Sequence, residues 1–273
     1  MKTTKKYTLI TGSSMGLGKE MATECARRGR NLILVALPGG DLQHFCDELQ
    51  HTFLIHAVCR ECDLTDEQEL SEMADGLLAK YNIDQLINNA GVGGTTRFED
   101  SSPEYLDRII HLNIRATTIL TRLMLPELKK HGHALILNVA SVAAFGPLPF
   151  KTIYPASKAF IYSFSRSLSH ELKGTGVKVS VLTPGPIMTN ADVSARIMKQ
   201  GFLARLCLQT ASQITLHALN GVAHGKEVIV PGKMNRLNRF LIKWTPESLR
   251  LGLMYKVIQR ELPEPVKILT NPN

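Results

Sequence analysis

The sequence predicts an α/β fold in which a doubly wound, seven-stranded parallel sheet is followed by a helical C-terminal extension. Seven apolar runs, rich in valine, isoleucine and leucine, alternate along the chain with stretches long enough for a helix. Most of these runs are continuously apolar, which is typical of parallel strands that are buried on both faces. The runs occupy residues 7–11, 31–37, 53–59, 83–90, 133–141, 177–184 and 226–232.

The length and composition are consistent with one large folded domain. The chain has 273 residues, and 44% of them are hydrophobic, which is enough for a sizeable core. No repeat, low-complexity tract or Pro/Gly/Ser-rich linker interrupts the chain before its C-terminal region. We therefore expect one domain over residues 1–231 and a basic, amphipathic helical extension over residues 232–273.

The charge is unevenly distributed. The formal net charge is +8, yet from Lys233 onward eight basic residues stand against three acidic ones. No glycine-aromatic RNA motif or zinc finger accompanies this charge, so we expect no nucleic-acid partner. We find no secretory signal before the first apolar run and no apolar span of transmembrane length, and we therefore expect a cytoplasmic protein.

The cysteines fit a reduced protein. They are five in number and lack the spacing of a disulfide framework. Cys59 and Cys62 form a C-x-x-C pair at a strand end, but no second pair lies at zinc-site spacing. We expect neither structural disulfides nor a metal site.

A glycine-rich turn follows the first predicted strand. Residues 11–18 read TGSSMGLG and open a helix that we expect to end near Arg28. Gly12, Gly16 and Gly18 permit a tight turn and a close backbone approach, so that a dinucleotide pyrophosphate can meet the free N–H groups of the helix start. Such a turn can also be purely structural, but its place at the first strand-to-helix turn favours a dinucleotide.

Tyr154 and Lys158 lie four residues apart in YPASK, thirteen residues after Ser141. On a helix this spacing puts both side chains on one face, where the ammonium can lower the pKa of the phenol. The phenol then becomes a usable acid or base near neutral pH. The same spacing also occurs on ordinary solvated helix faces, so the pair alone does not establish any chemistry.

Taken in order, the motifs over roughly residues 5–231 resemble those of the short-chain dehydrogenases/reductases, including the G-x-x-x-G-x-G spacing of the glycine turn. Each match has a structural alternative, since an asparagine can cap a strand and prolines can punctuate a loop, but the common order favours the family. The other matches are Asp63 in CDLT, NNAG at 88–91, Asn113 in LNIRATT, Ser141 in NVAS, the Tyr154 and Lys158 pair, and Pro184, Gly185, Pro186 and Thr189. The resemblance implies a Rossmann-type fold.

The resemblance also implies a reaction, namely hydride transfer between a nicotinamide and a carbonyl or secondary alcohol carbon. In such a site Tyr154 passes the proton and Ser141 hydrogen-bonds the same oxygen. Lys158 lowers the tyrosine pKa and holds ribose hydroxyls, and Asn113 steadies a water that leads to the lysine. The implied cofactor-binding residues are Gly12, Ser14, Gly16, Leu17, Gly18, Asp63, Leu64, Asn89, Ala90, Gly91, Tyr154, Lys158, Pro184, Gly185, Ile187 and Thr189.

The choice of dinucleotide depends on the end of the second strand. An acid there would bind the ribose hydroxyls of NAD, and an arginine would favour the phosphate of NADP. The strand ends at Val35, Ala36 and Leu37, with neither, and the lack of an acid removes repulsion against a phosphate. We therefore favour NADP(H) over NAD(H). Met15 stands where NADP-preferring relatives often carry a base, and residues 38–40 offer either N–H groups for the phosphate or a plain turn.

Two C-terminal segments bear on the substrate. Residues 190–207 would form the substrate lid, and their apolar side chains indicate a hydrophobic carbonyl compound. In the extension, Thr245, Pro246 and Glu247 predict the N-cap, first position and first-turn acid of a second helix. The first helix would place Leu237, Phe240, Leu241 and Trp244 opposite Arg236, Arg239 and Lys243. Its apolar face can pack on the domain, lie in a subunit interface or contact a membrane peripherally.

Two further expectations concern assembly and activity. Members of the family often assemble through the helices expected here at Tyr105–Lys130 and Tyr154–Lys173, so the resemblance implies a homodimer or homotetramer. The competing function is a non-catalytic dinucleotide-binding sensor or regulatory protein. Such a binder has no physical need for Asn113, Ser141, Tyr154 and Lys158 together, and we therefore favour the enzyme.

Overall fold

A computed structural model describes residues 4–188 and 206–262 and confirms the predicted parallel sheet. The seven strands lie in the order β3-β2-β1-β4-β5-β6-β9, and all neighbours are parallel. They are β1 (Lys6–Thr11), β2 (Asn31–Ala36), β3 (Ala57–Glu61), β4 (Asn82–Asn88), β5 (Ala134–Val139), β6 (Val177–Leu182) and β9 (Val228–Ile229). The strand order reverses between β1 and β4, which makes the sheet doubly wound.

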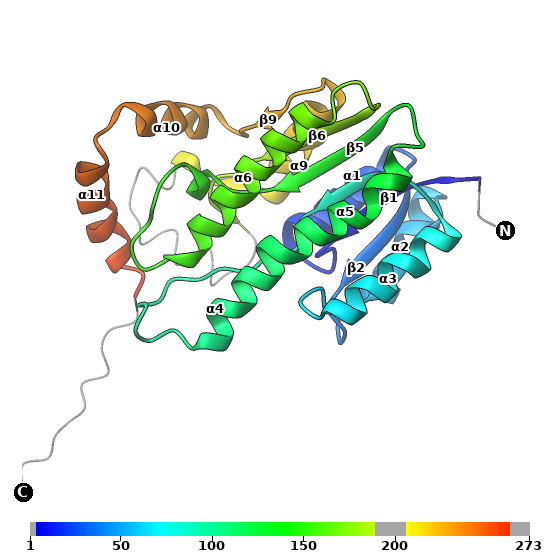
Figure 1. The fold of residues 1–273 in the computed structure, drawn as a ribbon, viewed down its shortest axis with the longest axis horizontal. Helices are drawn as coiled ribbons and strands as arrows, with labels where there is room; N and C mark the ends of the chain where they lie inside the picture. The colour runs from blue at the N-terminus through cyan, green and yellow to red at the C-terminus, as the bar shows by residue number, and fades with distance from the viewer. Residues whose placement is uncertain (1–3, 189–205, 263–273) are drawn as a thin grey trace, which may run out of the picture.

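Helices cover both faces of the sheet (Figure 1). One layer contains α1 (Gly16–Arg27), α2 (Leu42–Phe53) and α9 (Ala211–Ala223), and the other contains α3 (Glu67–Lys80), α5 (Thr117–Leu128) and α6 (Ile153–Glu171). The remaining helical elements are α4 (Pro103–Ile110), the π-helical turn η1 (His111–Ala116), the 3-10 turn η2 (Val142–Phe145), α10 (Lys233–Trp244) and α11 (Glu247–Gln259).

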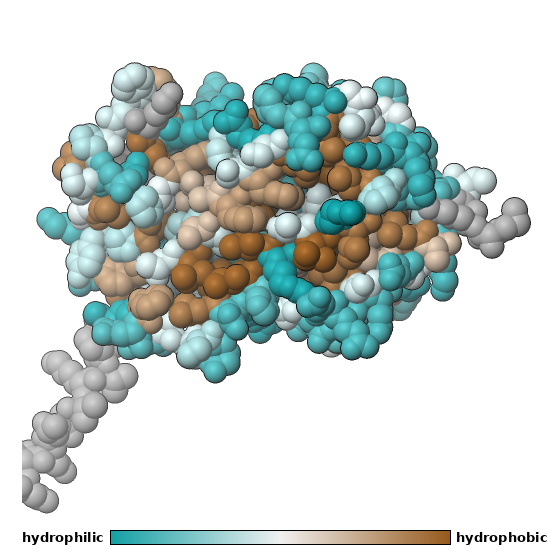
Figure 2. Space-filling view, in the orientation of Figure 1, coloured by the Kyte–Doolittle hydropathy of each residue, from teal (hydrophilic) through white to brown (hydrophobic). Residues whose placement is uncertain are grey.

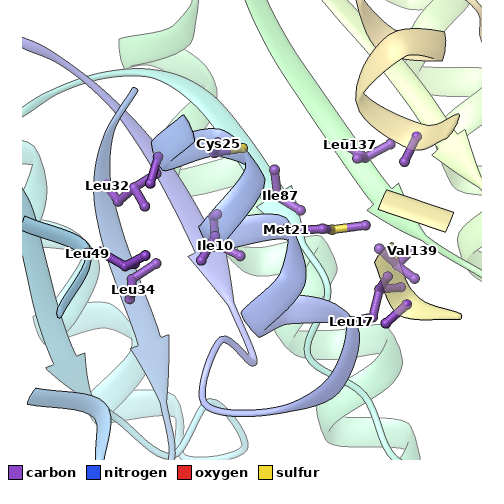
Figure 3. Packing of buried hydrophobic residues seen from close by; sticks show 14 of the residues in the cluster. Ile10, Leu17, Met21, Cys25, Leu32, Leu34, Leu49, Ile87, Leu137 and Val139 are labelled. Atoms are coloured by element: carbon purple, nitrogen blue, oxygen red, sulfur yellow. The ribbon is translucent and has the colours of Figure 1, made fainter. Parts of the chain in front are cut away.

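The strands are continuously apolar because each contributes side chains to both layers. Ile10 of β1 packs with Met21 and Cys25 of α1 in one hydrophobic cluster, as Figure 3 shows. Its neighbour Leu9 belongs to the cluster on the opposite face, together with Met124 of α5. All five side chains are fully or almost fully buried. Burial on both faces is the physical reason for the pattern seen in the sequence.

The third and last strands differ from the ranges that the sequence predicts. The third was predicted at 53–59, but Phe53 ends α2 and Leu54 has a left-handed φ of 56° with a side chain that is 91% exposed, so β3 begins only at Ala57. The last was predicted at 226–232, yet only Val228 and Ile229 pair with β6. A separate short sheet of β7 (Ile187–Met188) and β8 (Gln209–Thr210) has no recognisable pattern in the sequence.

The C-x-x-C residues lie on opposite sides of the sheet. The Cys59 thiol donates a hydrogen bond to Gln43 Oε1 at 2.7 Å and packs against the α2 layer. Cys62 is buried in the layer that contains α3. Residues three apart at a strand end point to opposite faces, so the two thiols do not share a site.

The extension forms the two helices that the sequence predicts, α10 and α11, but the junction between them differs by one residue. Pro246, and not Thr245, is the N-cap of α11. The Thr245 hydroxyl instead donates to Leu241 O at 2.8 Å at the end of α10, so it is not free to cap the next helix. Within the described ranges, none of the helices combines the length and apolarity needed to cross a bilayer.

Candidate active site

The predicted site residues gather where the parallel strands end. The glycine turn follows β1, Asp63 and Leu64 follow β3, residues 89–91 follow β4, Ser141 follows β5, and Pro184 and Gly185 follow β6. Since β1 and β4 are neighbours whose connections run to opposite sides, the crevice between them is the usual ligand position in a doubly wound sheet. The topology therefore brings five separated segments of the chain to one edge.

Glycine is required in the turn after β1. Gly12 and Gly16 have φ values of +65° and +56°, which disfavour other residues. A Cβ at Gly12 would lie 2.8 Å from Ala90 Cα, and a Cβ at Gly18 would lie 2.0 Å from Gly12 O. The turn thus packs backbone against backbone, and it leaves the start of α1 open for an anion.

Asn89 and Thr11 fasten this turn to the end of β4. The Asn89 side-chain amide donates to Thr11 O and to Gly12 O, each at 3.0 Å. In return, the Thr11 hydroxyl oxygen accepts hydrogen bonds from the backbone N–H groups of Asn89 and Ala90, each at 3.1 Å. Asn89 therefore fixes the backbone of the glycine turn beside the proposed cofactor crevice.

The residues after β3 lie on the side where an adenine is expected. The Asp63 carboxylate accepts hydrogen bonds from the backbone N–H and the hydroxyl of Thr65, at 2.9 and 2.7 Å. Leu64 is buried and lines one small hollow together with Thr11 and Ala90. Thr11 at the end of β1, Leu64 after β3 and Ala90 after β4 therefore meet around one hollow.

Ser141 and Tyr154 contact each other although thirteen residues separate them. Ser141 is the N-cap of η2, and its hydroxyl oxygen accepts a hydrogen bond from Ala143 N at 3.1 Å. The Ser141 hydroxyl is also hydrogen-bonded to the Tyr154 phenol. The Tyr154 ring lies directly against Gly93, where a Cβ would come within 2.3 Å of Cδ2. The phenol is therefore held between η2 and the loop that follows β4.

Lys158 is buried one turn further along α6. Its ammonium donates to Val139 O at 3.0 Å and lies 5.8 Å from the centre of the Tyr154 ring. It also faces Gly91, since a Cβ there would be 3.1 Å from Nζ. A larger residue than glycine at this position would collide with the lysine.

Asn113 lies in the π-helical turn η1 between α4 and α5, where the sequence indicated one long helix. Its side-chain carbonyl accepts from Val92 N, and its amide donates to Val92 O, both at 2.9 Å. The amide also donates to Ser157 Oγ at 3.0 Å, and that hydroxyl donates to Tyr154 O at 2.7 Å. Asn113 thus links the loop after β4 to the start of α6. Single π turns of this kind are frequent at functional sites.

Burial dominates the protonation of the pair. It raises the pKa of Tyr154, and the hydrogen bond with Ser141 opposes that rise. Burial also lowers the pKa of Lys158 to about 8. The sequence argument predicted a lowered tyrosine pKa, and the direction here is the opposite, because loss of water around the phenol outweighs the hydrogen bond with Ser141.

Two buried asparagine side chains on neighbouring strands support the site. Asn88 and Asn138 are register partners on β4 and β5, and the Asn88 amide donates to Asn138 Oδ1 at 2.8 Å. Asn88 also donates to Thr121 Oγ1, and Asn138 donates to Ser165 Oγ, each at 2.9 Å. Asn88 therefore does not merely cap a strand, since it joins the sheet to α5, while Asn138 joins it to α6.

The segment after β6 borders the same crevice. Val142 N donates to Pro184 O at 2.9 Å, which places Pro184 beside η2. Gly185 lies under Asn235 of α10, whose Oδ1 would be 2.4 Å from a Cβ at that glycine. Ile187 is partly buried against the α1 layer. Thr189 and lid residues 190–205 lie outside the described residues.

The end of β2 carries no side-chain charge. Ala36 is buried, Leu37 is 43% exposed, and residues 38–40 form an exposed turn. The hydroxyl of Ser13 donates to Val35 O at 3.1 Å, and Ser14 lies near Gly40. The first acid after β2 is Asp41, which pairs with His44 at 3.7 Å. The glycine turn and the β2 end are thus adjacent.

Several residues of this site do not stand out in the sequence. Thr11 was read only as part of the glycine turn, although the Thr-Gly step at a strand end could have indicated its role. Ser157 could have been found from its place one turn after Tyr154 and beside Lys158. Gly93 and Asn235 act through contacts across the chain, and no local signal identifies them.

Comparison with known proteins gives the family. Residues 6–200 match the family model of the short chain dehydrogenases. The chain is 34% identical over 187 residues to 7alpha-hydroxysteroid dehydrogenase of Escherichia coli (strain K12), which covers 68% of this chain and 72% of that protein. The chain belongs to the short-chain dehydrogenase family, whose members are oxidoreductases.

Solved structures agree with this assignment. The short-chain dehydrogenase from Sphingobium yanoikuyae in complex with NADPH superposes with a TM-score of 0.76 at 28% identity, over 93% of this chain and 96% of that one. The bulky-bulky ketone specific alcohol dehydrogenase from Comamonas testosteroni gives a TM-score of 0.74 at 28% identity over the same shares. The Rossmann-type fold expected from the sequence is confirmed.

Proposed function

We propose that this protein is an NAD(P)-dependent dehydrogenase/reductase that transfers a hydride between nicotinamide and a carbonyl or secondary alcohol, with Tyr154 as the acid/base. The observation that carries the proposal is the convergence of Ser141, Tyr154, Lys158 and Asn113 around residues 91–93 at the ends of β4 and β5. A sensor that only binds a dinucleotide would not need this set.

The geometry supports a distinct role for each side chain. The Tyr154 phenol reaches the substrate oxygen as proton donor in reduction, and the Ser141 hydroxyl beside it hydrogen-bonds the same oxygen. Lys158 lies one turn away and would hold ribose hydroxyls of the cofactor. Asn113 fixes the Val92 backbone and Ser157, and so orients the start of α6. The nicotinamide supplies the hydride when bound.

The protonation of the pair suits reduction near neutral pH. Burial raises the pKa of Tyr154, so the phenol keeps the proton that a carbonyl must receive. The pKa of Lys158 is about 8, so the lysine is mostly charged at pH 7 and could supply a proton near the phenol. The phenol is therefore protonated at neutral pH, which is the form that ketone reduction requires.

We propose NADP(H) over NAD(H) as the cofactor. The end of β2 offers no carboxylate that would repel a 2′-phosphate, and Ser14 lies beside the glycines of the following turn. The solved relative from Sphingobium yanoikuyae binds NADPH. Thermal-shift titration of NADPH against NADH tests this choice, and a larger stabilisation by NADH at equal concentration would contradict it.

We propose a hydrophobic, bulky ketone or the corresponding secondary alcohol as the substrate class. The relatives named above act on hydroxysteroids and on ketones with two bulky substituents, as their names state. In this chain Phe150 lines one hollow together with Tyr154, and its ring contacts the ring of Tyr255 on α11. The lid predicted at 190–207 would complete this wall.

The decisive variant is Tyr154→Phe. It removes only the phenol hydroxyl, so NADPH binding should stay within about twofold while kcat for ketone reduction falls by about a thousandfold. NADPH oxidation at 340 nm against a panel of bulky ketones measures turnover. Turnover close to wild type in this variant would overturn the acid/base assignment, and a wild type that binds NADPH but reduces no ketone would favour the sensor.

We also propose that the protein forms homodimers or homotetramers through its long helices. Phe160 on α6 and Ile119 on α5 are 41% and 37% exposed, and Phe160 stacks on Phe164 with ring centres 6.1 Å apart. Figure 2 shows hydrophobic residues along the middle of the face where Figure 1 shows α5 and α6. This exposed apolar surface is the observation that favours assembly.

A peripheral membrane contact is proposed for α10. Four apolar side chains that are 47 to 70% exposed recur along this helix, with basic residues between them: Leu237, Phe240, Leu241 and Trp244. Such a face, ending in tryptophan and flanked by Lys233 and Arg236, fits the headgroup region of an anionic bilayer. The cytoplasmic location expected from the sequence stays a prediction.

A further inference from the structure

The C-terminal extension carries, just after α11, a buried carboxylate that lies in the active-site region. Glu261 follows α11, and its side chain is only 2% exposed. Its Oε2 accepts a hydrogen bond from the Thr95 hydroxyl at 2.7 Å and lies 3.0 Å from the Lys151 ammonium. The Lys151 ammonium also donates to Oε1 at 3.2 Å. A carboxylate this deeply buried needs such partners to remain charged.

The two partners of Glu261 belong to the two loops that hold Tyr154. Lys151 lies three residues before Tyr154, and Lys151 O accepts a hydrogen bond from Tyr154 N at 3.0 Å. Thr95 lies two residues after Gly93, against which the Tyr154 ring packs. The loops are also joined directly, because Thr96 N donates to Phe150 O at 2.8 Å. The carboxylate therefore bridges the segment before the catalytic tyrosine and the segment under its ring.

The loop before Tyr154 needs such support because part of it is strained. Phe150 has a φ of +62°, which a bulky residue adopts only where its surroundings enforce it. Its ring contacts the Tyr255 ring of α11 at 5.0 Å between centres. Phe150, Lys151 and Tyr154 line one hollow. The extension thus holds both the side chain of the strained residue and the ammonium of the next one.

The extension also contacts η2, the turn that carries Ser141. Arg250 of α11 lies over Gly146, where a Cβ would be 2.8 Å from Nη2. Arg239 of α10 lies 5.0 Å from the Phe145 ring and donates to the Tyr162 hydroxyl at 3.0 Å. Figure 1 shows α10 and α11 in orange and red, around one end of the domain. Between Ser141 and Tyr154, the extension therefore contacts Phe145, Gly146, Phe150 and Lys151.

We propose that Glu261 is a positioning residue whose ion pair with Lys151 and hydrogen bond from Thr95 fix the Tyr154 phenol in its reactive position, which makes the C-terminal extension part of the active site. This inference rests on the proposed function. Glu261 does not touch the reacting atoms. A small displacement of the phenol is enough to lower the rate, since catalysis depends on the alignment of the reacting groups.

The test compares Glu261→Ala and Lys151→Met with the control Glu247→Gln, which removes a 67% exposed carboxylate from the start of α11. Glu261→Ala should lower kcat by about tenfold or more while the Kd for NADPH changes by less than about twofold. Combining Glu261→Ala with Lys151→Met should cost little more than either change alone, because both break one ion pair. Additive losses, or a kcat for Glu261→Ala equal to that of Glu247→Gln, would overturn the proposal.

A second readout does not depend on turnover. Hydrogen exchange of the peptides spanning 93–97 and 148–156 should accelerate in folded Glu261→Ala, because the amides of Thr96 and Tyr154 lie in the two loops that the carboxylate joins. The control should leave both peptides unchanged. If the wild type reduced no ketone, the proposed function would fail while this measurement still decided the positioning role. Unchanged exchange in Glu261→Ala would reject that role even in an active enzyme.

Discussion

The two walls of the crevice are built in different ways. The wall at β1 and α1 consists of backbone and glycine, and its contacts come from Thr11 to Gly18 and from Asn89 and Ala90 at the end of the adjacent strand. The wall at Ser141 and Tyr154 consists of side chains, and the groups that hold it come from residues as distant as Glu261. The first wall is defined by local motifs, whereas the second depends on the C-terminal chain. We expect variants on the two walls to separate cofactor binding from catalysis.

After Tyr154→Phe, the largest effect is expected on the side-chain wall from Lys158→Met. Loss of the ammonium removes a proposed ribose contact and raises the pKa of Tyr154 further, so kcat should fall by about a hundredfold or more and the pH optimum should move upward. Rate profiles between pH 6 and about 9.5 measure both changes. An unshifted pH optimum would show that Lys158 does not influence the pKa of Tyr154.

The same variant has a predicted effect on stability. The pKa of Lys158 is about 8 in the folded chain against 10.5 in the unfolded one, so the unfolded state binds more protons between these values. The free energy of unfolding of the wild type should therefore rise with pH, relative to Lys158→Met, from about pH 8 upward. Urea unfolding at two pH values on either side of 8 checks the sign, and an equal pH dependence in both proteins would contradict it.

A smaller effect is expected on the backbone wall from Gly18→Ala, which should weaken cofactor binding and leave catalysis unchanged. The new Cβ would meet Gly12 O at 2.0 Å, so the turn must shift, and we expect a loss of about 1–3 kcal/mol in stability. NADPH affinity should fall by about tenfold, while kcat at saturating NADPH stays near wild type. The control is Gly76→Ala within α3, where a Cβ meets nothing within 4 Å and should stabilise the helix slightly. Unchanged NADPH affinity in Gly18→Ala would contradict the expectation that the backbone wall governs cofactor binding.

The smallest effect on the reaction is expected from the outer face of the extension. The double variant Phe240→Ser and Trp244→Ser removes side chains that are 60% and 70% exposed, so turnover of a water-soluble ketone should be unchanged. Sedimentation with phosphatidylserine-containing vesicles should fall severalfold if α10 meets the bilayer, because most of the exposed apolar area is lost. If the wild-type protein does not bind anionic vesicles, the membrane contact is rejected, and packing on the domain or in a subunit interface remains for α10.

Local patterns in the sequence were sufficient for most of the sheet. Continuous apolar runs predicted the strands because parallel strands are buried on both faces, and Leu9 and Ile10 show this directly. The start of β3 was predicted too early because Leu54, an apolar residue, serves as the exposed end of α2. An apolar residue in a sequence does not show whether its side chain is buried in the fold, and this limits how well strand boundaries can be predicted.

For the candidate site, too, the sequence predicted some features and missed others. The catalytic and glycine positions were expected from spacing and family resemblance, and the structure gathers the described ones at one edge of the sheet. The direction of the Tyr154 pKa shift was predicted wrongly, because the sequence shows the charge of Lys158 but not the burial of both groups. The role proposed for Glu261 could not be anticipated, since 110 residues separate it from Lys151.

By itself, the sequence determined the class of fold and the glycine turn, because these depend on periodicity and on spacing within single elements, and its resemblance to the family predicted which residues would move a proton. Only the tertiary structure decided which of these residues meet, how deeply Tyr154 and Lys158 are buried, and that the C-terminal extension reaches the loops around them. Burial and contact between distant segments arise from the packing of the whole chain, and no local pattern records them.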